Sequence, residues 1–557
     1  MTAIGTRPAA DSPAASGRHR ANQLARASLG TASATLLSRL TGLLRLVVLA
    51  YALGGAKLAD AFNLANNTPN MIHDLVLGGV LASTFVPVFV ERLATRSRDE
   101  AVESISAVVS LSVVVLVVTT VLFWLAAPAV IDLYTFGKTA PAERAVAVDL
   151  LRMFAPQLLC YGAISLMAAI LATRDRFVTV GFVPVLNNLV GIAVLLAFAV
   201  VGHTATITGV RAHTGLLELL GIGTTAGVAL QALALVPSMA RAGLRLRFVW
   251  RPRDPAVRTI MALSGWTFGF VVANQLAVFI VLALEYHLGP GNVSAYTYAF
   301  QFFQFPFGVV AVSVINVASP DLTRAWASGQ LATMGRRVGR ATRQTLALVL
   351  PSTVGYLLLA RPIIDLVLRH HALTVGEART TAEVLVMFAL GLPAFCIFLV
   401  TIRAFQAMQD TRTAFVLYVL ENGTNILAAI LLYHVLGVRG LALSYSIAYT
   451  VGAAVSLLVL RERLGTIGGR GVLVASLRSL ALSLVMAFVV ALVSAVLGAG
   501  TGSGAGGWAR LVVTVLAGGA VYLGGAGAAS AVRSWQTSRR RGRDHPKGIR
   551  ARHRAHH

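Results

Sequence analysis

Long apolar stretches, separated by short polar segments, follow one another along most of the chain. A helix needs about 20 mostly apolar residues to cross the hydrocarbon core of a bilayer. Stretches of this length predict about fourteen membrane-spanning helices, at residues 26–50, 70–90, 102–125, 146–172, 178–201, 215–240, 258–284, 292–318, 344–360, 381–409, 413–436, 441–460, 471–499 and 508–532. The pattern therefore predicts an all-α polytopic membrane protein.

The polar segments between these stretches fall into two sets by charge. Counted alternately from the N-terminal tail, one set holds more than three times as many lysines and arginines as the other. Cytoplasmic loops of membrane proteins collect lysine and arginine. The basic set contains both tails, so we expect both termini in the cytoplasm.

The composition agrees with a membrane protein. Of the 557 residues, 56% are hydrophobic and 12% are charged, whereas soluble domains carry about 25% charged residues. The formal net charge of +25 could indicate nucleic-acid binding. Because the basic residues lie in the predicted cytoplasmic segments, we attribute the charge to topology and expect no nucleic-acid partner. We interpret the basic C-terminal tail as a topology anchor that touches anionic lipid, with a partner-binding arm as the alternative.

An internal repeat divides the chain. The segment that begins at Arg152 resembles the one that begins at Val386, and Cys160 and Cys396 occupy equivalent positions in the two segments. The offset covers six predicted helices, so both copies have the same orientation, as in transporters that bind substrate between two parallel repeats. The predicted units are an N-terminal tail (1–25), a first lobe (26–240), a basic linker (241–257), a second lobe (258–460), two further helices (471–532) and a basic tail (533–557).

Two arginines, Arg39 and Arg45, lie within the first predicted span. An arginine near the centre of a bilayer costs about 2.5–3.5 kcal/mol on insertion scales, so it is retained where it faces a partner or a hydrated cavity. Six residues turn a helix by about 240°, and the two side chains therefore do not share a narrow stripe. Both could line one wide cavity, or one could pair with Asp60 or Asp74.

Other polar side chains in the predicted spans suggest weaker sites. His73 could contact a phosphate through its imidazolium form or form an interfacial pair with Asp74. In the second lobe, Glu421 and Asn425 lie one turn apart and could hold Na⁺ or a proton together with Asn274. A structural polar cluster is the alternative for this second group.

A last group lies at predicted cytoplasmic helix ends. We expect these residues either to form salt bridges of an inner gate or to cap turns, and they are Arg174, Arg403, Asp410 and Arg412.

Several motifs resemble those of one transporter family. The segments "SRLTGLLR", "LADAFNLANNTPN", "LGGVLASTFVPVFVE", "FQFPFGVVAVSV" and "RAFQAMQDTRTAF" are similar to those of the MurJ/MviN proteins, the lipid II flippases of the multidrug/oligosaccharidyl-lipid/polysaccharide exporter superfamily. The resemblance implies two six-helix lobes plus two C-terminal helices, and a cationic central cavity that opens alternately to each side of the bacterial inner membrane. It also implies that the last two spans form a groove for the polyprenyl tail.

The resemblance assigns roles to single residues. Arg39 and Arg45 match two cationic cavity residues of the family, and Asp60 matches its acidic residue. Four positions depart from the family pattern, because polar uncharged residues or histidine replace charged ones, and these are Asn67, His73, Gln301 and Gln304. The two glutamines could donate hydrogen bonds to a sugar or peptide.

These patterns lead to one preferred function and to alternatives. The preferred function is translocation of an undecaprenyl-diphosphate-linked peptidoglycan precursor, with no cofactor and with Na⁺ or H⁺ as a coupling ion. The alternatives are an exporter of another lipid-linked glycan and a non-transporting scaffold in cell-wall assembly, and partners would be cell-wall or division proteins. A cationic drug exporter would need acidic cavity residues, which the arginines argue against. We expect no enzyme, because the polar segments contain no HExxH, paired CxxC, Walker or GxSxG motif.

Overall fold

The fold is known from a computed structural model that describes residues 13–78, 85–174, 177–201, 205–242, 246–263, 265–498 and 505–543. All regular elements in these ranges are helices, which confirms the all-α prediction. They are α1 (Pro13–Leu53), α2 (Lys57–His73), α3 (Val86–Thr95), α4 (Arg98–Thr135), α5 (Pro141–Phe154), α6 (Gln157–Ala172), α7 (Phe177–Val201), α8 (Ile207–Ala212), α9 (Thr214–Arg241), α10 (Pro255–Leu263), α11 (Gly265–His287), α12 (Asn292–Pro306), α13 (Val312–Ala327), α14 (Leu331–Val367), α15 (Val375–Ala407), α16 (Thr411–Leu436), α17 (Val438–Leu464), α18 (Gly469–Leu497) and α19 (Ala505–Arg543), with π-helical turns η1 (Asp74–Gly78) and η3 (Phe307–Ala311).

The lengths and apolar character of these helices agree with a polytopic membrane protein. Within the described residues, twelve spans are long and apolar enough to cross a bilayer, and the pair α12 and α13, bent by 45°, makes a thirteenth. The remaining predicted span, 70–90, coincides with α2, η1 and α3, and part of it lies outside the described residues.

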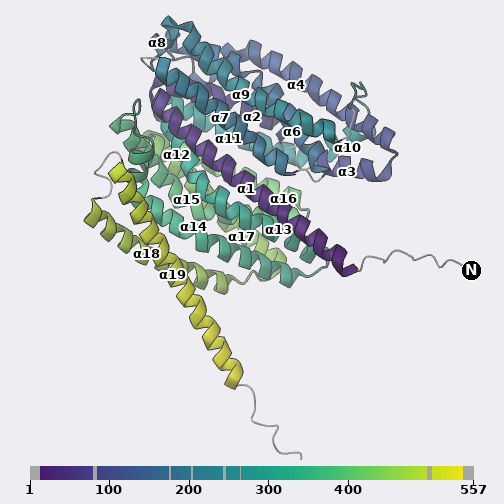
Figure 1. The fold of residues 1–557 in the computed structure, drawn as a ribbon, viewed down its shortest axis with the longest axis vertical. Coiled ribbons are helices and arrows are strands. Elements are labelled where there is room, and N and C mark those ends of the chain that lie inside the picture. Colours follow the sequence, from purple (N-terminus) through teal and green to yellow (C-terminus); the bar gives the residue numbers. More distant parts are fainter. Residues whose placement is uncertain are drawn as a thin grey trace, which may run out of the picture.

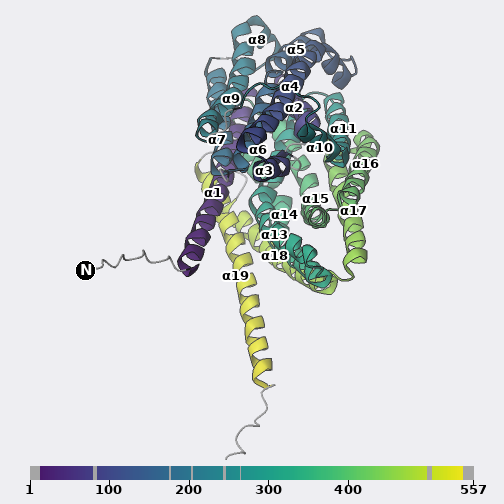
Figure 2. The same cartoon turned by 90° about the vertical axis from the view of Figure 1, so that its right-hand side faces the viewer.

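Two groups of helices form two lobes. Helices α1 to α9 occupy the upper part of Figure 1, and α12 to α17 occupy the lower part, with α11 between them. Helices α18 and α19 pack against each other and against α14, on the outside of the second lobe (Figure 2). The two C-terminal helices therefore stand apart from the lobe interface.

The second span of each lobe contains a π-helical turn at an equivalent position. Asp74 opens η1 and Phe307 opens η3, and these residues lie 233 positions apart, close to the offset of the sequence repeat. Single π-helical turns occur frequently at functional sites because they locally change the direction of side chains. Both turns adjoin polar residues that the sequence singled out.

Two predicted spans each coincide with two helices. The span predicted at 146–172 becomes α5 and α6, because Pro156 lacks an amide hydrogen and its ring crowds the preceding turn. The span predicted at 258–284 coincides with α10 and α11, and residue 264 between them lies outside the described residues. Residues Ala256, Val257 and Ile260 of α10 pack into a core with α3 and α4, so this short helix belongs to the first lobe.

The linker between the lobes is held along α4. The amides of Arg247 and Val249 donate hydrogen bonds to the hydroxyls of Ser106 (3.3 Å) and Ser110 (3.0 Å). The linker then enters α10. The first lobe therefore carries both the linker and α10 as one packed unit.

Candidate functional site: the cavity between the lobes

A pocket of about 340 Å³ lies between α1 and α7 of the first lobe and α12 of the second. Its lining residues are Thr35, Ser38, Arg39, Gly42, Leu43, Gly181, Pro184, Gln301 and Phe305. Arg39 lies four residues from the midpoint of the span Ser33–Leu53, which corresponds to about 6 Å along the helix axis. The pocket therefore exposes an arginine well inside the thickness of a bilayer.

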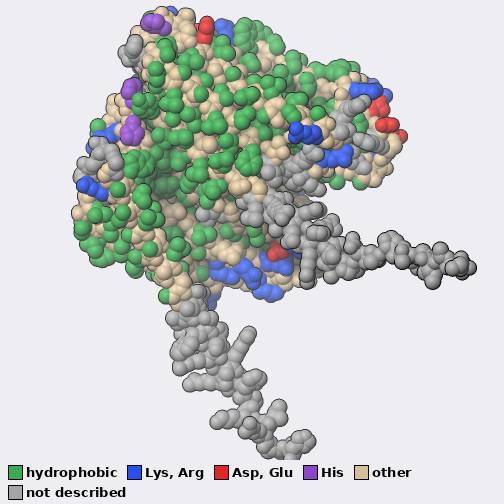
Figure 3. Space-filling model, in the orientation of Figure 1, with side chains coloured by type: hydrophobic (Ala, Val, Ile, Leu, Met, Phe, Trp, Pro, Cys, Tyr) green, Lys and Arg blue, Asp and Glu red, His purple; other side chains and the backbone are tan. Residues whose placement is uncertain are grey.

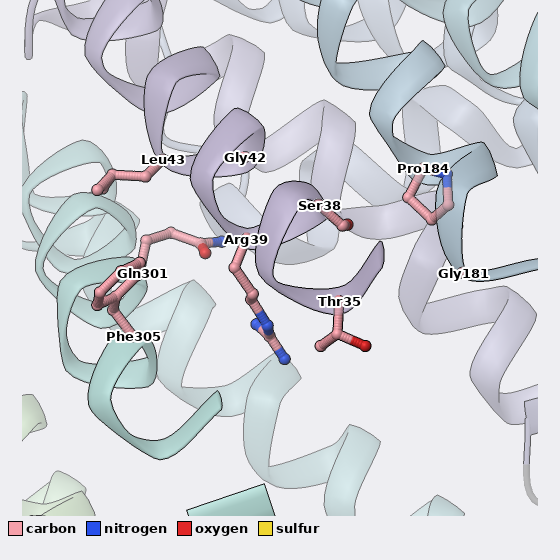
Figure 4. A pocket seen from close by; sticks show the side chains of 9 residues that line it. All are labelled: Thr35, Ser38, Arg39, Gly42, Leu43, Gly181, Pro184, Gln301 and Phe305. Atoms are coloured by element: carbon pink, nitrogen blue, oxygen red, sulfur yellow. The ribbon is translucent and has the colours of Figure 1, made fainter. Parts of the chain in front are cut away.

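The side chain of Arg39 extends away from α1 toward the second lobe. Figure 4 shows it in the space between α1 and α12, with Gln301 nearby. Gly308 of η3 makes room for it, because a Cβ atom there would lie 2.9 Å from Arg39 Nε. Among the described residues, no carboxylate forms an ion pair with Arg39. Its charge is thus available to an anionic ligand.

Arg45 points in a different direction, into the first lobe. Its side chain packs against Gly191 of α7, where a Cβ atom would lie 2.6 Å from Arg45 Nε. It interacts electrostatically with Tyr161 of α6, and no ion pair joins it to a described carboxylate. The separation of the two arginines follows from the helical rotation between them. Because α7 also lines the pocket at Pro184, Arg45 lies two helical turns further along the same wall.

His73 and Asp74 belong to a polar group at the α2–η1 junction. His73 is 9% exposed; its Nε2 lies 3.2 Å from Ser165 Oγ, and its Nδ1 lies 3.3 Å from Asp74 Oδ1. Gln275 of α11 donates hydrogen bonds to Asp74 Oδ2 (3.4 Å) and to the carbonyl of Met71 (3.2 Å). The structure therefore uses this pair to connect the lobes, and neither residue lines the pocket.

Asp60 also connects the lobes. It is 3% exposed, and its carboxylate accepts hydrogen bonds from the amides of Gly291 and Ser294 and from the Ser294 hydroxyl (2.7 Å). Asn63, one turn along α2, donates to the same hydroxyl at 3.2 Å. These amides lie in the first turn of α12, where backbone N–H groups lack helical partners and favour negative charge.

Other contacts between the lobes cluster near Asp60. Tyr298 of α12 donates a hydrogen bond to the carbonyl of Gly54 (2.7 Å). The rings of Tyr51 and His371 stack at 4.8 Å, and the amide of Ala372 donates to the carbonyl of Tyr51. We call this end of the bundle, with its contacts at residues 51–63, 291–298 and 371–377, the closed end. The opposite end, which carries the linker, is the linker end.

Glu421 lies near the middle of α16 and is 2% exposed. Its Oε2 atom has no hydrogen-bond partner among the described residues. Asn425 accepts a hydrogen bond from Ser444 Oγ at 2.9 Å. Helix α11 packs along α16, with Gly269 next to Phe415 and Val281 next to Ala429. Asn274 lies between these two contacts and thus at about the height of Glu421, but no described contact joins the two residues.

The proposed inner-gate residues make no described ion pair across the lobes. Arg463 of the same lobe pairs with Asp410 at 3.0 Å, and Asp410 also caps α16 by accepting from the Thr413 amide. Arg403 donates to Gln406 Oε1 on its own helix. Arg174 and Arg412 are exposed at the linker end. Of the two predicted roles, an inner-gate salt bridge or a turn cap, Asp410 has the second.

Asp410 lies between two spans, and its electrostatic surroundings are defined. Partial burial raises the pKa of this carboxyl, but hydrogen bonds from Thr413 and the positive charge of Arg463 outweigh burial and hold the pKa below its usual value. The ionised carboxylate therefore stabilises the turn between α15 and α16.

Several residues at the site escaped the sequence analysis. Ser294, Gln275 and Ser165 provide the partners of Asp60, Asp74 and His73, but single serines and glutamines carry no pattern. The remaining departures from the family pattern, Asn67 and Gln304, are partly buried and do not line the pocket.

Comparison with known proteins identifies the family. The family described as "Lipid II flippase MurJ" matches residues 49–503, which is most of the chain. The chain belongs to the lipid II flippase MurJ family. It is therefore a transporter and not an enzyme. Among MurJ relatives, the "Probable lipid II flippase MurJ" of Rhizobium meliloti (strain 1021) is 30% identical, over 75% of this chain and 77% of that protein. The "Lipid II flippase MurJ" of Burkholderia cenocepacia is 25% identical, over 79% and 84%.

Solved structures agree on the fold. A structure described as "Lipid II flippase MurJ, inward closed conformation" superposes with a TM-score of 0.72 at 23% identity, over 89% of this chain and 97% of that one. An inward-facing multidrug resistance transporter of the MATE family has a TM-score of 0.61 at 15% identity, over 78% and 98%. The fold of this chain is thus similar to the folds of both transporters.

Proposed function

We propose that this MurJ family member moves lipid II, the undecaprenyl-diphosphate-linked peptidoglycan precursor, from the cytoplasmic to the outer leaflet. The observation that carries the proposal is an arginine without a carboxylate partner, Arg39, in a pocket between the lobes at bilayer depth. A diphosphate that leaves water without compensation meets a large desolvation cost. The planar guanidinium binds phosphate oxygens through two parallel hydrogen bonds and stays charged at cellular pH.

The pocket and its surroundings suggest how the headgroup is held. Arg39 receives the diphosphate, and Arg45 is the second cation along the α7 wall. Gln301, which lines the pocket, donates hydrogen bonds to the sugar or peptide. His73 and Asp74 hold η1 against α11 through Gln275 and set the shape of the cavity rather than contacting phosphate.

Alternating access is supported by the uneven distribution of contacts. The polar contacts of Asp60 and Tyr298 join the lobes at the closed end. The linker end carries the basic loops and is cytoplasmic by the rule that such loops stay inside. We therefore infer access from the cytoplasm in this arrangement, with both termini on that side of the inner membrane. Release to the outer leaflet requires the closed end to open.

A coupling ion would act at Glu421, whose buried carboxyl has an oxygen without a hydrogen-bond partner. An ionisable residue in this position is retained in membranes for proton or cation transfer. Substitution Glu421→Gln keeps the shape and removes the charge change. We expect flipping in vesicles to lose its response to an imposed pH or Na⁺ gradient, while flipping without a gradient persists. An unchanged gradient response would exclude this role.

Depletion of the native protein tests the main proposal. Lipid II should accumulate on the cytoplasmic face, and wild-type protein should restore its appearance outside. The Arg39→Ala variant should not restore it, Arg39→Lys should restore it partly, and Arg336→Gln, an exposed arginine on α14, serves as the matched control. Full restoration by Arg39→Ala would contradict the role of the pocket. Normal lipid II flipping after depletion, in cells without a second flippase, would favour another lipid-linked glycan or a scaffold role.

A further inference from the structure

The linker and α10 expose an unusual combination of side chains. Phe248 is 72% exposed, Trp250 is 55% exposed, and Met261 of α10 is 71% exposed. Four arginines in the same segment are also exposed, namely Arg247, Arg251, Arg253 and Arg258. We call these seven residues the linker surface. In Figure 3, the Lys and Arg side chains near α10 border a largely hydrophobic face.

The linker is held against α4 by hydrogen bonds and an ion pair. Arg247 and Val249 donate their amides to Ser106 and Ser110, which lie one turn apart on α4. Ser104 Oγ donates to Asp254 Oδ2 at 3.4 Å. Arg251 forms an ion pair with Glu103 at 2.8 Å. The exposed aromatic rings therefore belong to a segment that is held in place on the folded first lobe.

With the midpoint of α4 taken as the bilayer midplane, the linker lies at the depth of a membrane boundary. The midpoint of α4 falls between residues 116 and 117, so Ser110 and Ser106 lie about 10 and 16 Å from it along the helix. The hydrocarbon core extends about 15 Å from its midplane. Val249, which is bound to Ser110, is therefore the linker residue closest to the α4 midpoint among those with described hydrogen bonds to α4. Asp254, which is bound to Ser104, lies further from that midpoint. Nearby on α4, Val113 and Val117 are exposed and apolar, as expected of a helix that borders lipid.

We propose that the linker surface binds anionic phospholipid headgroups of the cytoplasmic leaflet. Tryptophan and phenylalanine favour the zone between headgroups and hydrocarbon, and arginines near an anionic leaflet are attracted to its phosphates. Arg247 and Arg253 have no described partner and are free to do so. The proposal rests on the orientation given above, in which the linker end faces the cytoplasm. It assigns the linker a role in holding the entry side of the first lobe at the leaflet that contains the substrate.

The experiment measures lipid contact at Trp250. Full-length protein is placed in lipid bilayer discs that contain brominated phosphatidylglycerol or brominated phosphatidylcholine at equal fractions. The signal of Trp250 is the fluorescence difference between wild type and Trp250→Phe. We expect brominated phosphatidylglycerol to quench this signal more strongly. The preference should fall by about five-fold for each arginine removed in the double variant Arg247→Gln/Arg253→Gln.

Controls separate local binding from general charge effects. The double variant Arg336→Gln/Arg340→Gln removes two exposed arginines of the second lobe and should keep the preference. The variant Arg247→Lys/Arg253→Lys should also keep it, because the charge remains. If the glutamine variant does not fold, wild type in high salt provides the test, since screening should reduce the preference.

Three results would overturn the proposal. They are equal quenching by the two lipids, no quenching by either lipid, and an unchanged preference in the glutamine variant. Shielding of Trp250 from aqueous iodide in native vesicles, but not in lipid discs, would instead indicate a protein partner. Flipping measured in parallel distinguishes this outcome from failure of the proposed function, because quenching requires no transport.

Discussion

Removal of the Asp60 carboxylate should open the closed end. In the folded protein it accepts hydrogen bonds from two backbone amides and one hydroxyl at the start of α12. The substitution Asp60→Ala leaves these donors buried without a partner, at a cost of about 1–3 kcal/mol for each. Water satisfies them once the lobes separate, so the cost falls on the closed state alone.

The magnitude is taken from the two backbone amides, which are fixed in direction, whereas the Ser294 hydroxyl can rotate its hydrogen toward another acceptor. We expect the closed state to lose about 2–6 kcal/mol relative to the open state. At about 1.4 kcal/mol for each factor of ten, the equilibrium shifts by roughly 30-fold to 20,000-fold. A minor open state that holds about 1% of wild-type molecules would then become a major one.

Electron–electron double resonance can measure this shift. Spin labels at the exposed residues Lys138 and Val375 report the separation of the lobes at the closed end, in a background in which both native cysteines are alanine. Wild type should give one short distance, and Asp60→Ala should add a longer one. The control is Asp132→Ala, because the Asp132–Arg144 ion pair lies within the first lobe at the same end. Identical distance distributions in wild type and Asp60→Ala would refute the assigned role of Asp60.

Three further predictions test other contacts. Gly308→Val should abolish flipping although Arg39 is intact, because the new Cβ displaces the Arg39 guanidinium. Flipping at the wild-type rate would contradict the position assigned to the Arg39 side chain beside Gly308. Asp410→Asn should lower the melting temperature in detergent at pH 7. The folded-state pKa of Asp410 lies below the unfolded value of about 3.9, so its carboxylate stabilises the fold above that range. The difference in melting temperature from wild type should therefore vanish as the pH falls below about 3.9 and through the folded-state pKa. A difference that persists at low pH would argue against a stabilising role of the Asp410 charge. Tyr522→Phe should weaken the docking of α19 by about 1 kcal/mol, through loss of its hydrogen bond to the Ala347 carbonyl, and unchanged proteolysis of α19 would exclude that contribution.

The sequence predicts the helices of this fold well because their apolar length is a local property. It does not predict where they break. Pro156 could have suggested the break between α5 and α6, but Pro184 and Pro393 lie inside continuous helices. The placement of α10 in the first lobe depends on the packing of Ala256 and Ile260 against α3 and α4. Contacts of this kind have no periodic signal in nine residues.

The site shows the same division. Arg39 could be predicted because an arginine in an apolar span is costly wherever it lies. The contact of Arg39 with Gly308 and the hydrogen-bond partners of Asp60 could not be predicted, because these residues come from the other lobe. The Asp60 partners are mostly backbone amides, which every residue except proline possesses. A pattern search for side-chain partners therefore pairs Asp60 with an arginine, whereas the fold pairs it with the start of α12.

The two polar features at the lobe interface have different consequences for transport. Asp60 has its hydrogen bonds satisfied within the protein, and it stabilises one arrangement whether or not substrate is present. Arg39 has no such partner among the described residues, so its free energy depends on what enters the pocket. A ligand shifts a conformational equilibrium only by its difference in affinity for the two states. A diphosphate that draws Arg39, Gln301 and the α7 wall together can offset the loss of the Asp60 contacts, and an empty pocket cannot. In the proposed mechanism, substrate-dependent opening thus requires both groups: a fixed contact at the closed end and an uncompensated cation within the cavity.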